Sequence, residues 1–173
     1  MKKFFAKNSG FNLPELMIVI TIIAIISVMA AANLRDGRHR IALDNQAAEF
    51  AQDLRQAQEW ALSLRGWPAA AGYGVYIEND GLNKYILYAD LNNNKVYDVG
   101  DAVQKTVSLN EAIEIAALNP DPIDINYLAA ESAMAIINGG GAQTLEAVFR
   151  VKNAPTMTRA VAANVAGLVY VEQ

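Results

Sequence analysis

The chain has no cysteine and only one histidine among its 173 residues. Disulfide bonds, thiolate metal ligands and a cysteine nucleophile are therefore excluded. His39 stands next to Arg38 and Arg40, which favours a charge cluster over a general base. The sequence also lacks a phosphate-binding glycine loop and a nucleophile-elbow motif. We therefore predict that the chain is not an enzyme and requires no cofactor.

Charged side chains are missing from one long stretch near the N-terminus. From Leu16 to Leu34 there is no Asp, Glu, Lys, Arg or His across 19 residues, about 28 Å of helix. Such a run is long enough to span the hydrocarbon core of a bilayer. Lys2, Lys3 and Lys7 precede the run, and Glu15 lies directly at its edge. A carboxylate in that position needs a partner or a function.

The rest of the chain is acidic. The formal net charge is -4, and without the first ten residues there are 11 basic and 18 acidic side chains, a net charge of -7. Such a domain is a poor non-specific ligand for nucleic acid or anionic lipid.

Three interpretations of the N-terminus are open. A secretory signal peptide would use the lysines as its basic region and the alanines at 30–32 as its cleavage site, but Glu15 lies against the apolar core of that signal. A simple signal anchor is the second interpretation. Arg35, Arg38 and Arg40 follow the run as closely as the lysines precede it, so charge does not set its orientation.

The third interpretation rests on the stretch "GFNLPELMIVI". Its Gly10, Phe11 and Glu15, followed by an uninterrupted apolar run, resemble the class III signal of type IV pilins and type II secretion pseudopilins. The resemblance implies that a prepilin peptidase cleaves between Gly10 and Phe11 and that Phe11 is N-methylated. Asn12 departs from the usual Ser or Thr. Pro14 lies in the first turn of the mature helix, where its missing N–H breaks no bond.

The same resemblance gives Glu15 an assembly role. Cleavage would create an ammonium group on Phe11, and an unpaired buried charge costs several kcal/mol. In the family the carboxylate is thought to pair with the N-terminal amine of a neighbouring subunit. The alternative is that Glu15 reaches the lipid headgroups by itself.

The apolar run continues into an amphipathic helix. Its apolar positions recur at intervals of three and four and end before Gly66 and Pro68, which stop the helix: Ala47, Phe50, Leu54, Ala57, Ala61 and Leu64. We expect nearly one helix from Phe11 to Arg65, interrupted only at Gly37.

The remaining sequence predicts a β-rich head. Alternating apolar residues bounded by turn signals predict strands at 72–77, 85–89, 103–109, 113–118, 123–128, 145–151, 158–165 and 168–171. The stretch 129–137 is ambiguous, and the glycines at 139–141 predict a flexible loop. This order is similar to the pilin fold, an α+β fold in which a long N-terminal transmembrane helix packs on a C-terminal antiparallel β-sheet head.

Within that superfamily the chain is most similar to the H-type (GspH/FimT-like) minor pseudopilins. "AAEFAQDLRQAQEWALSLRG", "GYGVYI", "YILYADLNNNKVYDVGD" and "NVAGLVYVE" resemble the helix end, the first hairpin and the closing strands of that family. The implied organisation is a cleaved leader (1–10), a transmembrane and assembly segment (11–34), an amphipathic helix (35–66) and a head (67–173).

The resemblance implies a structural subunit of a type II secretion pseudopilus or a type IV pilus. Its partners would be other pilin or pseudopilin subunits, the prepilin peptidase and the membrane. It implies a single-pass protein of the bacterial inner membrane with an extracytoplasmic head. An unrelated signal-anchored or secreted β-domain protein is the alternative.

A second alternative is a minor pilin of a competence pilus that binds DNA. Arg150, Lys152 and Arg159 form a sparse basic group, and phosphate contacts need only local charge. Solvated strand faces explain the same residues.

One loop has the ligand spacing of an EF-hand calcium site. In "DLNNNKVYDVGD" side-chain oxygens occupy loop positions 1, 3, 5, 9 and 12, with a carbonyl at position 7: Asp90, Asn92, Asn94, Asp98, Asp101 and the carbonyl of Val96. Lys95 replaces the expected glycine at position 6, and Asp101 is shorter than the usual glutamate. The alternative is a loop whose Asp and Asn side chains cap their own backbone.

The mature N-terminus is the most direct test of the leader prediction. Intact-mass analysis of the protein should show a chain that begins at methylated Phe11, and Gly10→Val should block processing. A chain that begins at Met1 or Asn33, or normal processing of Gly10→Val, would remove the basis for the pilin resemblance.

Overall fold

The computed structural model describes residues 12–63, 70–129 and 135–172, and of residues 30–35 it describes only the helical backbone. The chain divides into two compact units, Met1–Arg38 and His39–Gln173. Helix α1 (Leu13–Ser63) has residues in both units. Gly37 lies inside this helix, and the predicted stop at Gly66 and Pro68 falls outside the described residues.

The amphipathic stripe predicted for the second part of α1 is confirmed. Its described members Ala47, Phe50, Leu54, Ala57 and Ala61 are all essentially inaccessible to solvent. The opposite face is exposed along the whole segment from Asp44 to Ser63. A helix with one apolar stripe can bury only that stripe, so this segment lies against the rest of its unit along one side.

The prediction of a transmembrane helix is wrong. In the part of the chain that the structure describes, no helix is both long enough and apolar enough to cross a membrane. The described side chains from Leu16 to Met29 cover about 21 Å of helix, whereas the hydrocarbon core is about 30 Å thick.

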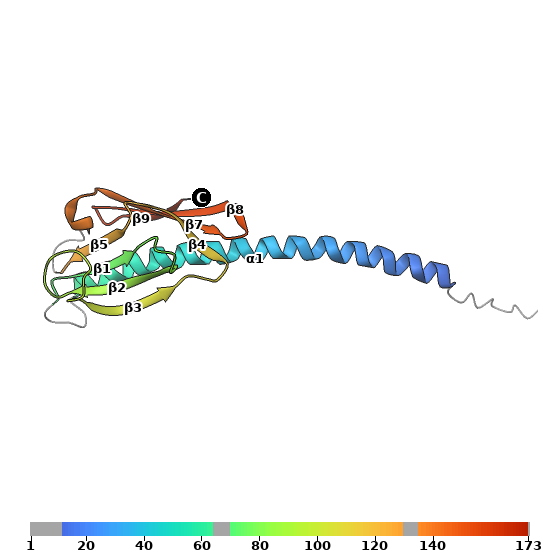
Figure 1. Cartoon of the computed structure of the whole chain (residues 1–173), viewed down its shortest axis with the longest axis horizontal. Coiled ribbons are helices and arrows are strands. Elements are labelled where there is room, and N and C mark those ends of the chain that lie inside the picture. The colour runs from blue at the N-terminus through green and yellow to red at the C-terminus, as the bar shows by residue number, and fades with distance from the viewer. Residues whose placement is uncertain (1–11, 64–69, 130–134, 173) are drawn as a thin grey trace, which may run out of the picture. The chain divides into compact units, whose positions relative to one another are not determined.

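The unit His39–Gln173 contains two antiparallel sheets (Figure 1). The first has the strand order β3-β2-β1-β5-β6 and the second the order β4-β7-β8-β9. The strands are β1 (Gly72–Ile77), β2 (Lys84–Asp90), β3 (Ala102–Ser108), β4 (Ile113–Asn119), β5 (Ile123–Leu128), β6 (Ala135–Ile137), β7 (Thr144–Val151), β8 (Ala154–Asn164) and β9 (Val169–Glu172).

All eight strands expected from the sequence are confirmed, but the single sheet is not. β4 leaves the first sheet and pairs with β7, so Ile113 lies opposite Val151. β5 returns to the first sheet and pairs with β1. The ambiguous stretch contributes the short strand β6, and the three glycines belong to a 3-10 turn, η1 (Asn138–Gly140), and its C-cap rather than to an irregular loop.

Phe50 joins both sheets to α1. Its ring makes an edge-to-face contact with Tyr85 of β2 at a centroid distance of 5.1 Å. On the other side it makes a second such contact with Phe149 of β7 at 5.4 Å. All three rings are fully buried. Edge-to-face aromatic pairs contribute about 0.5–1.5 kcal/mol beyond the area that they bury.

One carboxylate of α1 lies in the same core. Asp53 is only 3 % exposed. It accepts a hydrogen bond from the Tyr85 hydroxyl at 2.7 Å, and the Lys105 ammonium of β3 contacts both of its oxygens at 2.8 and 2.9 Å. A buried charge is tolerated when it is paired and hydrogen-bonded in this way. Burial, together with this carboxylate, holds the pKa of Tyr85 well above its usual range.

Phe50→Ala should destabilise the unit His39–Gln173 strongly. The substitution leaves a cavity between α1 and both sheets, and such changes cost about 3–5 kcal/mol. Thermal unfolding of the full-length chain measures the effect. Ile41→Ala is the matched control on the same helix, because Ile41 is 62 % exposed. Equal melting temperatures for the two variants would contradict the central position of Phe50.

Candidate functional site

The predicted cleavage site at Gly10 and Phe11 lies outside the described residues. Glu15 is described, and it lies in the first turn of α1 with an exposed side chain. The first helical hydrogen bond runs from the Leu16 N–H to the Asn12 carbonyl at 3.2 Å. A carboxylate in this turn is also stabilised by the positive end of the helix dipole. Among the described residues Glu15 has no ion pair.

An apolar surface covers α1 from Leu13 to Met29. Every large hydrophobic side chain in this range is between 41 % and 73 % exposed. The two hydroxyl groups in the range do not interrupt this surface. Thr21 donates to the Met17 carbonyl and Ser27 to the Ile23 carbonyl, both at 2.7 Å. Because both hydroxyls are satisfied within the helix, another apolar surface can cover the part from Leu16 to Met29 without leaving either hydroxyl unpaired.

The predicted calcium loop connects β2 to β3. Asp90 is the last residue of β2, and β3 begins directly after Asp101. The loop carries Tyr97, whose ring lies 5.1 Å from the ring of Tyr76 and 5.2 Å from that of Tyr88. The loop is thereby held against the outer face of the first sheet.

The carboxylates at the two ends of the loop accept hydrogen bonds from the loop backbone. The Asp90 oxygens accept from the N–H groups of Asn93 at 2.7 Å and Lys95 at 3.0 Å. Asp101 accepts from two further backbone N–H groups at 3.1 and 2.9 Å. Lys95 adopts the left-handed conformation (φ 69°) that glycine usually supplies at position 6 of such a loop.

The middle positions of the loop follow the same pattern. The side-chain oxygens of Asn92 and Asn94 each accept from the N–H two residues further on, at 3.0 Å. Asp98 accepts from the Gly100 N–H at 2.6 Å and from the amide groups of both asparagines. These bonds hold the pKa of Asp98 below its usual range. Every side-chain oxygen predicted to bind calcium is therefore already an acceptor within the molecule, and the self-capped alternative describes this conformation.

Three polar residues under the loop are not recognisable from the loop sequence. Tyr88, Asp124 and Asn126 are buried on the outer face of the first sheet. Asp124 accepts from the Tyr88 hydroxyl at 2.6 Å and from the Tyr97 N–H at 2.6 Å, and Asn126 donates to Asp90 at 3.2 Å. The only sequence signal for Asp124 and Asn126 is the alternation of polar and apolar residues in "IDINYL", which places both on one face of β5.

Gly74 makes room for this polar cluster. A Cβ atom at this position would lie 2.5 Å from the Tyr88 ring and 2.5 Å from the Ile125 carbonyl.

Burial raises the pKa of the carboxyl groups of both Asp124 and Asp101. Repulsion from Asp90 raises both as well.

The described residues contain no group of three or more His, Asp or Glu side chains placed to hold a metal ion. Calcium binding by residues 90–101 therefore stays a prediction. The carbonyl of Val96 is the ligand predicted at position 7. The N–H of the same residue donates to the side-chain oxygen of Asn94 at 3.0 Å.

The basic group near the C-terminus is largely neutralised. Arg150 pairs with Glu114 at 2.6 Å and Arg159 with Asp44 at 2.7 Å, whereas Lys152 is exposed. These geometries leave little free positive charge for phosphate contacts.

Trp60 packs on the core through an edge-to-face contact with Tyr73 at 6.1 Å.

Comparisons with protein-family models, with curated proteins and with solved structures find no match for this chain.

Asp90→Ala should destabilise the chain even in EDTA. The substitution removes the acceptor of two loop N–H groups and of one hydrogen bond from the buried Asn126 amide, and a buried group left unsatisfied costs about 1–3 kcal/mol. Asp80→Ala is the matched control, because Asp80 is exposed and accepts one backbone bond. Equal melting temperatures for the two variants in EDTA would contradict the self-capped loop.

The same measurement in millimolar Ca²⁺ tests the calcium prediction. Ligand binding to the native state alone adds RT ln(1 + [L]/Kd), about 2.7 kcal/mol at a hundredfold excess over Kd. If the loop binds calcium, the melting temperature of the wild-type chain rises on going from EDTA to Ca²⁺ and that of Asp98→Ala does not. The same melting temperature in both buffers would overturn the calcium prediction.

Proposed function

We propose that this chain is a structural subunit of a filament of the pseudopilin or minor-pilin type, assembled through the N-terminal part of α1. The observation that carries the proposal is the apolar surface from Leu13 to Met29. Large exposed apolar surfaces mark interaction sites, because soluble monomers rarely leave such an area in water. The class III resemblance of Gly10, Phe11 and Glu15 supports a filament of this type.

The energetics favour burial of this surface. Complete burial of one Leu, Ile, Val or Met side chain contributes about 1.5–3 kcal/mol. The surface offers many such side chains on every side of the helix, so several neighbouring helices can pack on it together. The internal hydrogen bonds of Thr21 and Ser27 remove the cost of covering their hydroxyl groups.

Glu15 is the selective contact in this proposal. Its carboxylate would pair with the ammonium of Phe11 in a neighbouring processed subunit. Apolar packing alone does not fix the register between two helices, whereas a single buried ion pair does. The prepilin peptidase is the second partner, because the ammonium exists only after cleavage.

The head serves as a folded module in this proposal. No observation favours the DNA-binding alternative, since Arg150 and Arg159 are already paired with carboxylates. The predictions that the chain is not an enzyme, and that it resides at the bacterial inner membrane with an extracytoplasmic head, stay predictions.

Glu15→Ala should leave processing intact and reduce assembly. The full-length chain would be produced together with a prepilin peptidase, and the share recovered in sedimentable assemblies would be measured beside the mature mass. We expect a decrease of at least about tenfold, which corresponds to the loss of about 1.4 kcal/mol per subunit contact.

Glu59→Ala is the matched control for this experiment. Glu59 is an exposed acidic residue of the same helix, outside the apolar surface. Normal recovery of Glu15→Ala would rule out the ion pair, and a wild-type chain that stays unassembled after correct processing would overturn the proposed function.

A further inference from the structure

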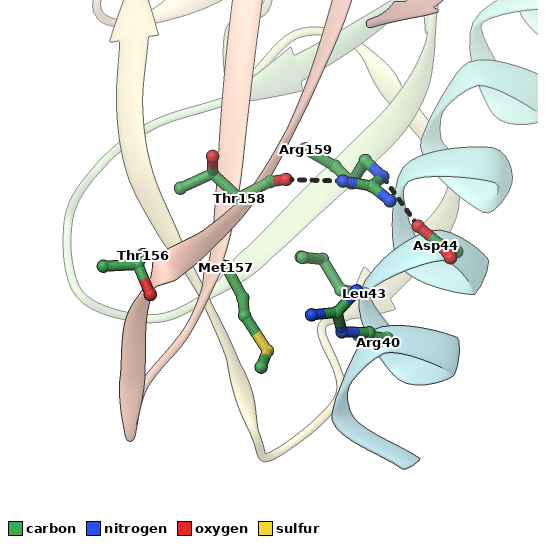
Figure 2. A pocket seen from close by; sticks show the side chains of 7 residues that line it. All are labelled: Arg40, Leu43, Asp44, Thr156, Met157, Thr158 and Arg159. Atoms are coloured by element: carbon green, nitrogen blue, oxygen red, sulfur yellow. Dashed lines mark hydrogen bonds and ion pairs between the residues drawn. The ribbon is translucent and has the colours of Figure 1, made fainter. Parts of the chain in front are cut away.

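A cavity of about 290 Å³ opens between α1 and the beginning of β8. Figure 2 shows Met157 and Arg159 of β8 pointing toward α1, where Arg159 reaches Asp44. The side chain of Leu43 is buried, and Met157 packs partly against the core. The cavity therefore combines apolar walls with a charged rim to which Arg40 belongs.

Arg40 differs from the other arginines described in this unit. Arg55 donates to the Val169 carbonyl at 2.9 Å, Arg150 pairs with Glu114, and Arg159 pairs with Asp44. Arg40 is exposed and has no hydrogen bond or ion pair among the described residues. Its guanidinium group is thus free to bind a carboxylate of another molecule.

A second, acidic cavity of about 160 Å³ lies on the outer face of the second sheet. The strand register places Asn119, Glu146, Ala162 and Tyr170 in one row across all four strands. Ala162 forms a low floor between Glu146 and Tyr170, and Glu172 also lines the cavity. Neither glutamate has an ion pair among the described residues.

The chemistry of this acidic cavity suits a guanidinium group. Carboxylates bind arginine through short, charge-assisted hydrogen bonds, and an aromatic ring attracts the flat cation. Tyr170 is 48 % exposed and lines the cavity together with both glutamates. A lysine would gain less from the ring.

We infer that Arg40 of one copy of this chain binds in the cavity formed by Glu146, Tyr170 and Glu172 of a second copy. The inference rests on the proposed function and adds a contact between heads. The argument for a second copy is charge complementarity, because one chain carries both the unpaired arginine and the unpaired carboxylates.

The two cavities lie on opposite faces of β8, because Met157 and Arg159 point toward α1 whereas Ala162 belongs to the outer face. Thr156, which lines the first cavity, and Asn164, opposite Thr144 at the second cavity, are eight residues apart on β8, about 26 Å. The two surfaces are also different patches, so the contact is heterologous: each copy offers its arginine to one neighbour and its carboxylates to another. Heterologous contacts that do not close into a ring produce filaments.

Cysteine cross-linking tests the contact directly, because the chain has no cysteine of its own. Thr156→Cys and Thr144→Cys place one thiol beside each cavity, both at exposed positions. A short bis-maleimide reagent cannot span about 26 Å within one molecule. In assembled full-length chain the double variant should form a ladder of covalent multimers, and neither single variant should form dimers.

Charge reversal then identifies the residues. Arg40→Glu and Glu146→Arg, each in the double-cysteine background, should reduce the ladder at least about tenfold, and their combination should restore it. Lys152→Glu is the matched control, an exposed cation of the second sheet outside both cavities, and should leave the ladder unchanged. No ladder, dimers from one single variant, or no rescue by the combined reversal would overturn the inference.

Sedimentation of the same samples separates this result from the proposed function. If the chain sediments as an assembly but gives no ladder, the contact between heads is wrong and the proposed function stands. If the processed chain neither sediments nor gives a ladder, the proposed function fails and the inference fails with it.

Discussion

The contact of Phe50 with both sheets is the interaction on which the rest of the head depends. Its ring is the point at which α1, β2 and β7 meet, through Tyr85 and Phe149. Asp53 follows three residues later on α1 and ties the same helix to β2 and β3. Hydrogen bonds and ion pairs are directional, whereas apolar contacts are not. The buried, paired carboxylate beside the aromatic cluster therefore fixes the orientation of α1 on the sheets, in addition to the apolar area that the helix buries.

The two parts of α1 have different surfaces. In the unit His39–Gln173 one stripe of α1 is fully covered by the two sheets. From Leu13 to Met29 the same helix exposes apolar side chains all around, and its polar side chains are either satisfied within the helix or placed at its first turn. A helix that is apolar on all sides is suited to burial among other helices. The head can therefore fold while the apolar side chains from Leu13 to Met29 stay exposed.

Much of the fold could be predicted from the sequence, because strand alternation, turn residues and the three-four rhythm of α1 are local signals. The partition into two sheets could not, since no local feature of residues 113–118 shows that β4 pairs with β7 rather than with β3. The transmembrane prediction, which rested on the length of the uncharged run and on the pilin resemblance, failed because the described part of the helix holds too short an apolar stretch. In the loop, the spacing of the Asp and Asn residues correctly marked a cluster of acceptors. The buried partners Asp124 and Asn126 were missed because they come from β5, more than 20 residues away in sequence.

The burial of the apolar surface between subunits is the central claim, and thiol accessibility measures it most directly. Ile22→Cys places a single thiol in the apolar surface of the full-length chain, and Glu111→Cys places one on the exposed head. Both would be labelled with a water-soluble maleimide in lipid-free assemblies and in dissociated chain. We expect the Ile22→Cys thiol to be protected in assemblies and reactive after dissociation, and the Glu111→Cys thiol to react in both. Equal labelling of the Ile22→Cys thiol in the two states would contradict assembly through α1.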